Sequence, residues 1–283
     1  MNEKLLSFGG KIMTVGGNAL SFSSVDPYNP LDLPPYTIRL KFTNGVTPSF
    51  SNGTATQVSS SPNVWDLSTA NETLPGNWDD LLEGQTDLLE VLGANATNVT
   101  STMEMFDHCS YLTDIALFDT SSVTTADGMF QFCIRLTTIP QFDFSENARM
   151  SSMFASDTAL TSVPLLDTRS CTEFDFMFQH CINLTSVPQF NTSNATTLRR
   201  MLDHCTSITA IPLFDTTNVT NMEGMCFETP NVASGALALY QQASSQSPSV
   251  SNHNYTFYHC GSDTTSGSAE LAQIPSSWGG TGA

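Results

Sequence analysis

Hydrophobic residues recur every 24 positions through the middle of the chain, and polar residues fill the positions between them. Methionine holds one position in six successive copies, and phenylalanine holds the next position in the first four. Further apolar columns and an acidic column keep the same phase. The two leading columns are Met105, Met129, Met153, Met177, Met201 and Met225, and Phe106, Phe130, Phe154, Phe178, Leu202 and Cys226. Five copies in phase without an insertion indicate an internal repeat.

A repeat this short cannot bury its apolar face alone, so we expect each copy to form one coil and stacking to supply the core. The segment from Leu136 to Phe142 predicts a brief strand in each coil that ends near Pro140, because proline cannot donate to a ladder. Apolar residues at Val219, Met222 and Met225 are three apart, which predicts one helical or 3₁₀ turn per coil. The expected fold class is an α+β repeat, a leucine-rich-repeat-type solenoid of 24-residue coils.

The repeat reads M-F-x-x-C-x-x-L-T-x-I-P-x-F-D-T-S, and over about residues 93–228 it resembles the BspA-like branch of the leucine-rich-repeat family. This branch occurs in surface proteins of bacteria, including mycoplasmas and gut bacteria, and in gut bacteriophage proteins. The resemblance implies a repeat fold and, by analogy, a role in adhesion. Asp157 replaces the expected cysteine, Asn147 replaces valine and Ala116 replaces proline.

The flanks differ from the repeats in kind. Residues 1–26 carry apolar runs around Gly-Gly pairs and predict a β-hairpin, which serves either as a separate attachment element or as ordinary strands that cap the fold. Residues 27–92 are expected to form a linker and an N-terminal cap, with a strand at 36–42 and a short helix at 77–82. Residues 229–283 are expected to form a C-terminal α/β cap and tail, with a helix at 234–243 capped by Ser234 and a strand at 255–260. The candidate attachment residues are Leu5, Phe8, Ile12, Val15, Leu20 and Phe22.

The composition of the chain argues against several classes of function. Nine basic residues face 27 acidic ones in 283 residues, which gives a formal charge of −18. No basic stripe exists to neutralise a phosphate backbone, so we expect no nucleic-acid binding and no docking on an anionic membrane. No run approaches the roughly 20 apolar residues of a membrane span, and residues 1–24 lack the continuous apolar region of a signal peptide. We therefore expect a chain made in a reducing compartment, with mostly free thiols.

Cysteines, histidines and acidic residues are the candidates for chemistry. Four cysteines share one column, which indicates a structural ladder of small buried thiols rather than disulfides or a zinc site. His-Cys pairs suggest a thiol–imidazole dyad, but adjacent side chains point apart, so we expect no enzyme activity, although exposed histidines leave a pH-sensitive contact open. Aspartates of the acidic column either cap turns or bind calcium, and capping is the simpler reading. No cofactor and no metal are expected. The structural ladder comprises Cys109, Cys133, Cys181, Cys205, Phe106, Phe130, Phe154 and Phe178, and the acidic column comprises Asp119, Asp143, Asp167, Asn191 and Asp215.

Two further columns are candidates for partner binding. The residue two before each acid lies between positions expected to be buried, so it should face outward, and exposed leucines on a repeating surface mark contacts. An adjacent loop or flank that shields them is the alternative. A threonine column should form a second outward ladder. These residues are Leu117, Gln141, Leu165, Gln189 and Leu213, and Thr113, Thr137, Thr161, Thr185 and Thr209.

Together these features predict a non-catalytic structural or recognition protein. We expect a bacteriophage virion component, a capsid decoration or fibre, made in the host cytoplasm. It would dock on other virion proteins of the capsid or tail through its N-terminus and present its repeats outward, with a host surface protein or glycan as a further partner and self-association left open. The alternative is a bacterial cell-surface adhesin of the BspA-like type.

Overall fold

The computed structural model describes residues 6–8, 11–13, 33–34, 36–50, 53–58, 63–68, 76–247 and 250–282. Near the N-terminus, strands β1 (Leu6–Phe8) and β2 (Lys11–Met13) pair antiparallel, with Ser7 opposite Ile12. A two-stranded hairpin is thus present where the Gly-Gly pattern predicted one.

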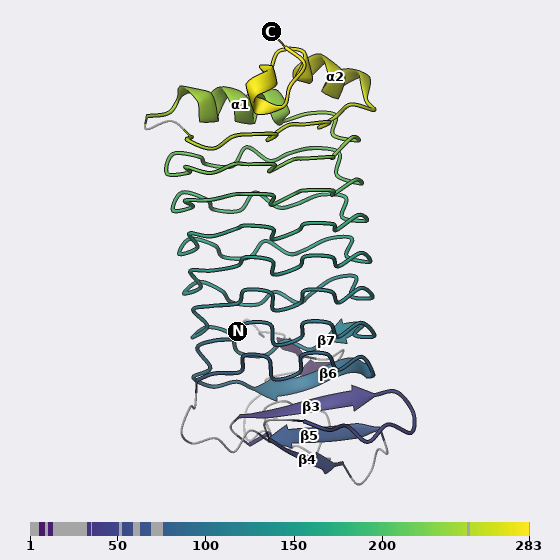
Figure 1. Cartoon of the computed structure of the whole chain (residues 1–283). Coiled ribbons are helices and arrows are strands. Elements are labelled where there is room, and N and C mark those ends of the chain that lie inside the picture. The colour runs from purple at the N-terminus through teal and green to yellow at the C-terminus, as the bar shows by residue number, and fades with distance from the viewer. Residues whose placement is uncertain are drawn as a thin grey trace.

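A five-stranded sheet covers the N-terminal end of the repeats (Figure 1). Its strands lie in the order β4-β5-β3-β6-β7, and only the β6–β7 pair is parallel. The buried residues Ile38, Leu40 and Phe42 alternate along β3, as expected of a strand with one face toward the core. β3 pairs with β6, which belongs to the first coil, and so covers the open edge of the stack. The strands are β3 (Thr37–Phe42), β4 (Thr54–Gln57), β5 (Val64–Ser68), β6 (Leu88–Asn95) and β7 (Asp114–Ile115).

Successive 24-residue coils stack directly on one another (Figure 1). Parallel bridges link one position in each coil to its counterpart in the next, and the last step reaches Asn252. The backbone N–H of Phe130 donates to the carbonyl of Met153 at 2.9 Å, and that of Phe154 donates to Met177 at 2.9 Å. The bridged positions are Asn77, Ser101, Thr125, Arg149, Glu173, Thr197, Asn221 and Asn252.

A chain of turns, and not a helix, forms the methionine–phenylalanine segment of each coil. Bonds such as Met225 N–H to Met222 O close turns of four residues, which produce the apolar spacing of three that suggested a helix. Two positions per coil have positive φ, and most are not glycine; Phe132 and His180 lie at 58° and 60°. Two left-handed residues four positions apart prevent a continuous right-handed helix in this segment. The helix expected at 77–82 is absent for the same reason, since Asp80 has φ 56°.

The expected fold class, an α+β leucine-rich-repeat-type solenoid, is wrong. Regular structure in the described residues is the β1–β2 hairpin, a mixed five-stranded sheet, one 3₁₀ turn and only two short α-helices, both C-terminal to the uninterrupted 24-residue repeats. Among the described residues, the strand expected in every coil occurs only in the first two coils, within β6 and as β7. In the later copies a proline two residues before the buried Phe or Leu removes a donor, and in the described residues this segment forms one isolated bridge, from Ala210 to Ser234. The architecture is mostly β, with stacked coils made of turns.

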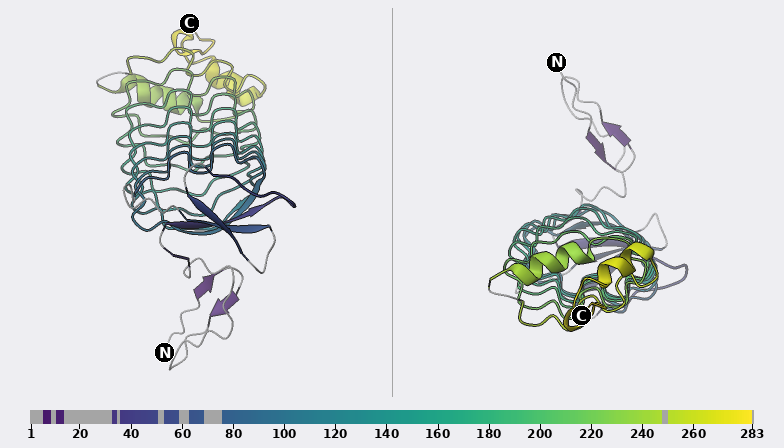
Figure 2. Two further views of the ribbon diagram at one scale, coloured as in Figure 1. Left: turned by 60° about the horizontal axis from the view of Figure 1, so that its bottom comes forward. Right: turned by 90° about the horizontal axis from the view of Figure 1, so that it is seen from above.

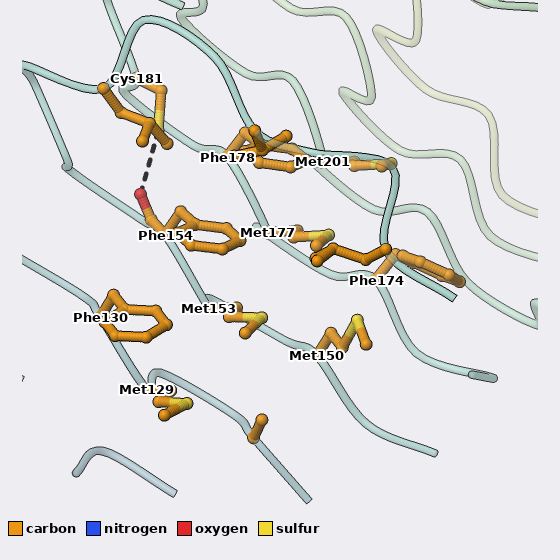
Figure 3. Close-up of a cluster of buried hydrophobic side chains, with 14 of the residues drawn as sticks. Met129, Phe130, Met150, Met153, Phe154, Phe174, Met177, Phe178, Cys181 and Met201 are labelled. Carbon is orange, nitrogen blue, oxygen red and sulfur yellow. Dashed lines mark hydrogen bonds between the residues drawn. The ribbon is translucent and has the colours of Figure 1, made fainter. Parts of the chain in front are cut away.

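Aromatic rings form the centre of the stack (Figure 3). The rings of Phe106, Phe130, Phe154 and Phe178 lie nearly parallel, with centroids 5.4 to 5.6 Å apart. All four side chains are fully buried. The methionine column packs beside them (Figure 3) as a second buried column, and flexible thioethers adapt well to irregular space in a core. Ring stacking therefore holds neighbouring coils at a common spacing.

Stacking extends beyond the expected limits of 93–228. Leu82 lies 24 residues before Phe106, and its N–H donates to Met105 O as in every later coil. At the other end, Cys226 N–H donates to Thr256 O, so residues 250–260 form one more coil after an inserted helix. Turns replace the strand expected at 255–260. The sequence concealed both coils because leucine replaces Met-Phe in the first and the insertion breaks the period in the last.

Two helices cover the C-terminal end (Figure 2). They are α1 (Ala236–Ser245) and α2 (Thr265–Leu271), followed by a 3₁₀ turn, η2 (Ser276–Trp278). Ser234 does not cap α1, whose N-cap is Gly235 with φ 102°. Instead the Glu270 carboxylate accepts the N–H groups of Gly235 and Leu237, at 3.4 and 3.0 Å. A carboxylate suits the positive end of a helix, so α2 caps α1 across the end of the stack.

Removing one ring from the aromatic stack should be strongly destabilising. We expect Phe130→Ala to lower the free energy of unfolding by about 3–5 kcal/mol in urea denaturation, because it leaves a cavity between two rings. Ile134→Ala, at a side chain 44% exposed in the same coil, is the control and should change stability by about 0.5 kcal/mol or less. A loss below about 1 kcal/mol for Phe130→Ala would contradict a role for the ring stack in stability.

Candidate functional site

The leucine–glutamine column runs along the outside of the stack. Its members are Leu117, Gln141, Leu165, Gln189 and Leu213, one per coil. The three leucines are 48%, 59% and 51% exposed, whereas the residues that follow them, Phe118, Leu166 and Phe214, are buried. In extended backbone neighbouring side chains point to opposite faces, so burial of one residue directs its neighbour outward.

Both glutamines are tied to the coil above them. Gln141 Nε2 donates to the carbonyl of Leu165, and Gln189 Nε2 donates to that of Leu213, each at 2.7 Å. These bonds hold the two amides in matching positions between the leucines. The glutamines therefore also have a structural role that the sequence did not indicate.

The acidic column lies two residues further along each coil. Each side chain accepts the N–H of the residue two positions on; Asp119 accepts from Ser121 and Asp143 from Ser145, both at 3.0 Å. Asn191 does the same with Ser193. These bonds are Asx turns, so the capping function considered for the column is present. Hydrogen bonds from Ser145 lower the pKa of Asp143, so this carboxylate is ionised at neutral pH.

The two columns share one face, where a shallow depression of about 530 Å³ lies between them. The residues that line it come from three consecutive coils, and Leu165 belongs to the middle one. Its lining combines apolar side chains, amide groups and carboxylates, and no sequence pattern predicted it. Its lining is Gln141, Phe142, Asp143, Leu165, Leu166, Asp167, Thr168, Gln189 and Asn191.

The threonine column is exposed along its whole length. The hydroxyl of Thr161 donates to the carbonyl of Thr137 at 3.2 Å, and that of Thr185 to Thr161 at 3.3 Å. Thr113 makes the same bond to Leu89. These hydroxyls are used between coils, so the column stabilises the stack as well as facing outward.

The cysteines of the structural ladder are buried and bond to backbone. Cys181 Sγ donates to the carbonyl of Phe154 at 3.0 Å (Figure 3), and Cys205 does the same to Phe178. Burial raises the pKa of Cys109 to about 12. His108 beside it is exposed and contacts Asp107, with Nδ1 2.8 Å from a carboxylate oxygen. The thiol and the imidazole therefore do not form a dyad.

Asp157 interrupts the cysteine ladder with a buried acid. Neither carboxyl oxygen has a hydrogen-bond partner, and the side chain is fully buried. Burial raises its pKa well above the ordinary value for aspartate. An acid in this environment takes up a proton rather than remaining charged.

The candidate attachment residues are described only in part. Phe8 and Ile12 lie in β1 and β2. Leu5, Val15, Leu20 and Phe22 lie outside the described residues.

A surface row of histidines and aromatics is a feature that the sequence indicated only through its His-Cys pairs. The rings of His108 and Phe132 lie 4.4 Å apart, and those of His180 and His204 lie 4.6 Å apart. His204 Nδ1 lies 2.5 Å from an oxygen of Asp203. Across the described ranges, no three His, Cys, Asp or Glu side chains are grouped so as to hold a metal ion.

The described helices include none long and apolar enough to cross a membrane.

The fold and the outer columns together define a class of protein: stacked 24-residue repeats that present the same positions outward in each coil. The family model described as "Mycoplasma protein of unknown function, DUF285" matches residues 80–162 and 134–238, more than half of the chain. The chain belongs to this family. No curated protein and no solved structure matches the chain.

Returning Asp157 to the residue of its column should stabilise the protein. We expect Asp157→Cys to raise the free energy of unfolding by about 1–3 kcal/mol at pH 7, the usual penalty of an unsatisfied buried polar group. Because the folded-state pKa is raised, wild-type stability should fall as pH rises from about 4 through that pKa. Urea denaturation between pH 4 and 8 measures both effects.

The variant Asp157→Asn separates the two effects, because it removes the titration but keeps a buried polar group without a partner. Its stability should lose the pH dependence without the gain shown by Asp157→Cys. Asp143 and Asp215, whose pKa values are lowered by hydrogen bonds from Ser145 and Thr217, lose their contribution only below about pH 4. Equal pH profiles for Asp157→Cys and wild type would show that Asp157 is not a buried acid.

Proposed function

We propose that the protein is a non-catalytic recognition protein whose stacked coils present the leucine–glutamine column to a partner. The observation that carries this proposal is the register of Leu117, Leu165 and Leu213, which are all about half exposed at the same position of alternate coils. Large apolar side chains aligned on one surface are typical of contact sites. With the described flanks in place the leucines stay exposed, which favours a contact over shielding.

A non-catalytic role agrees with the state of the nucleophiles. All seven cysteines are buried and free, and burial raises the pKa of Cys109 and Cys171 to about 12. A thiol with so high a pKa is not a nucleophile at neutral pH.

For its location, we propose a bacteriophage virion, as a capsid decoration or fibre. In this arrangement residues 1–26 dock on capsid or tail proteins and the stacked coils project outward, toward a host surface protein or glycan. The β1–β2 hairpin supports the docking role, because it is a small unit apart in sequence from the coils. The excess of acidic residues, which gives a formal charge of −18, favours contact with a protein or a glycan over contact with nucleic acid.

The second candidate is a bacterial cell-surface adhesin of the BspA-like type. The family match favours it specifically, since the family is described from mycoplasmas, which are bacteria. Both candidates use the same outer face and differ in where the chain is displayed.

Mass spectrometry of intact particles and of envelope fractions tests the location. Recovery at tens or hundreds of copies per virion is expected if the protein is a structural virion component. Recovery from a bacterial envelope fraction alone would contradict the virion assignment and support the adhesin.

Serine at the three leucines tests the face itself. We expect the triple variant Leu117→Ser, Leu165→Ser, Leu213→Ser to fold normally and to bind cells of the host at least about tenfold more weakly, measured with labelled protein by flow cytometry. About 1.4 kcal/mol of lost apolar contact is sufficient for that change. The control variant Ile134→Ser, Ile182→Ser removes two exposed isoleucines elsewhere in the stack and should bind like wild type. Unchanged binding by the leucine variant would place the site elsewhere.

A further inference from the structure

The spacing between the leucines of the leucine–glutamine column limits which backbone conformation a linear ligand can have. Bridged strands lie about 4.8 Å apart, so leucines in alternate coils are about 9.6 Å apart along the stack. Leu117, Leu165 and Leu213 thus mark two equal steps. A linear ligand along this column needs side chains with the same period.

Of the three regular backbone conformations, one matches this period. A β-strand presents side chains on one face about every 6.6 Å, and two turns of an α-helix advance about 10.8 Å. A polyproline II helix has three residues per turn and a rise of about 3.1 Å per residue, which gives about 9.3 Å per turn. Over the two steps between Leu117 and Leu213 its mismatch is about 0.6 Å, against about 2.4 Å for the α-helix.

The glutamines supply hydrogen bonds that such a ligand needs. A polyproline II helix makes no internal backbone hydrogen bonds, so its carbonyls seek donors. Gln141 and Gln189 each use one amide N–H on a backbone carbonyl, which fixes the group, and a primary amide carries a second N–H. These two amides are also two coils apart. They therefore offer donors at the same spacing as equivalent carbonyls of the ligand.

The acidic column determines the charge of the ligand. Asp143 and Asp167 line the same depression as Leu165, and Asp119 and Asp215 continue the column on either side. Arg169 pairs with Asp167, and Glu146 lies exposed one residue after the Ser145 that bonds to Asp143. The face is acidic beside an apolar line. A ligand with basic side chains on one edge and apolar ones on the next complements it.

We propose that this face binds a cationic, proline-rich peptide segment in the polyproline II conformation, with an apolar residue at every third position along the leucines. This inference rests on the proposed recognition function and names the class of its ligand. The same acidic edge makes a second copy of the chain a poor occupant, because the two acidic columns would meet.

Fluorescence anisotropy with the labelled peptide (Pro-Pro-Arg)₄ tests the proposal on the full chain. We expect saturable binding that is at least about tenfold tighter than that of (Gly-Ser-Arg)₄, which has the same charge but a flexible backbone. (Pro-Pro-Glu)₄ keeps the conformation and reverses the charge, and it should not bind. Added salt should weaken the interaction, since the acids are exposed.

Variants show whether the peptide occupies this face. Leu165→Ser should weaken binding about tenfold, and Gln189→Leu should weaken it by removing one donor. Ile182→Ser, at an exposed side chain outside the depression, should have no effect. Equal binding of the two cationic peptides, or binding that Leu165→Ser leaves unchanged, would overturn the proposal and indicate attraction to net charge alone.

The cell-binding experiment separates this inference from the recognition function. If the triple leucine variant loses cell binding while (Pro-Pro-Arg)₄ does not bind, recognition stands and the ligand class is wrong. If neither depends on the leucines, both are wrong. A concentration-dependent mass in sedimentation that Leu165→Ser abolishes would identify a second copy as the occupant and overturn the peptide assignment.

Discussion

Hydrogen bonding between coils is the constraint on which the rest of the structure depends. In the methionine–phenylalanine segment of each coil, the backbone N–H of every second residue donates to a carbonyl of the next coil, as that of Phe130 does to Met153. The intervening residues close tight turns, and positive φ at positions such as Phe132 makes this alternation possible. Left-handed non-glycine residues cost about 1–2 kcal/mol each, and the shared ladder and the stacked rings offset that cost. Because each coil satisfies only part of its N–H groups by its own turns, the coils are stable only as a stack.

This constraint explains which parts of the fold could be predicted from sequence. The 24-residue columns identified the stacked phenylalanines, because a ring that must lie on its counterpart recurs at the coil period. The secondary structure predicted for each coil is wrong. Spacing of three at Val219, Met222 and Met225 arises equally from a helix and from consecutive four-residue turns, and nothing in the side chains of Phe132 or Phe176 marks positive φ. Backbone conformation here is fixed by the neighbouring coil, which no local pattern contains.

On the outer face, too, local sequence predicted some features, whereas others depend on the neighbouring coil. Exposure of Leu117, Leu165 and Leu213 followed from burial of the residue after each, a local rule. The depression around Leu165 and the amide bonds of Gln141 and Gln189 depend on residues 24 positions away, so they appeared only in three dimensions. Asp157 stood out in the sequence as a departure from its column, but its lack of any hydrogen-bond partner required the packed structure.

Because leucine and glutamine alternate in the outer column, this protein has two repeat distances along its axis. The backbone repeats every coil, whereas the outer face repeats only every second coil. Duplication of one coil during evolution would leave the ladder intact and place two like residues side by side, which breaks the surface pattern at that point. Duplication of a pair of coils would lengthen the face and preserve its spacing. Variation in repeat number among related chains that keep this face should therefore be found in steps of two coils.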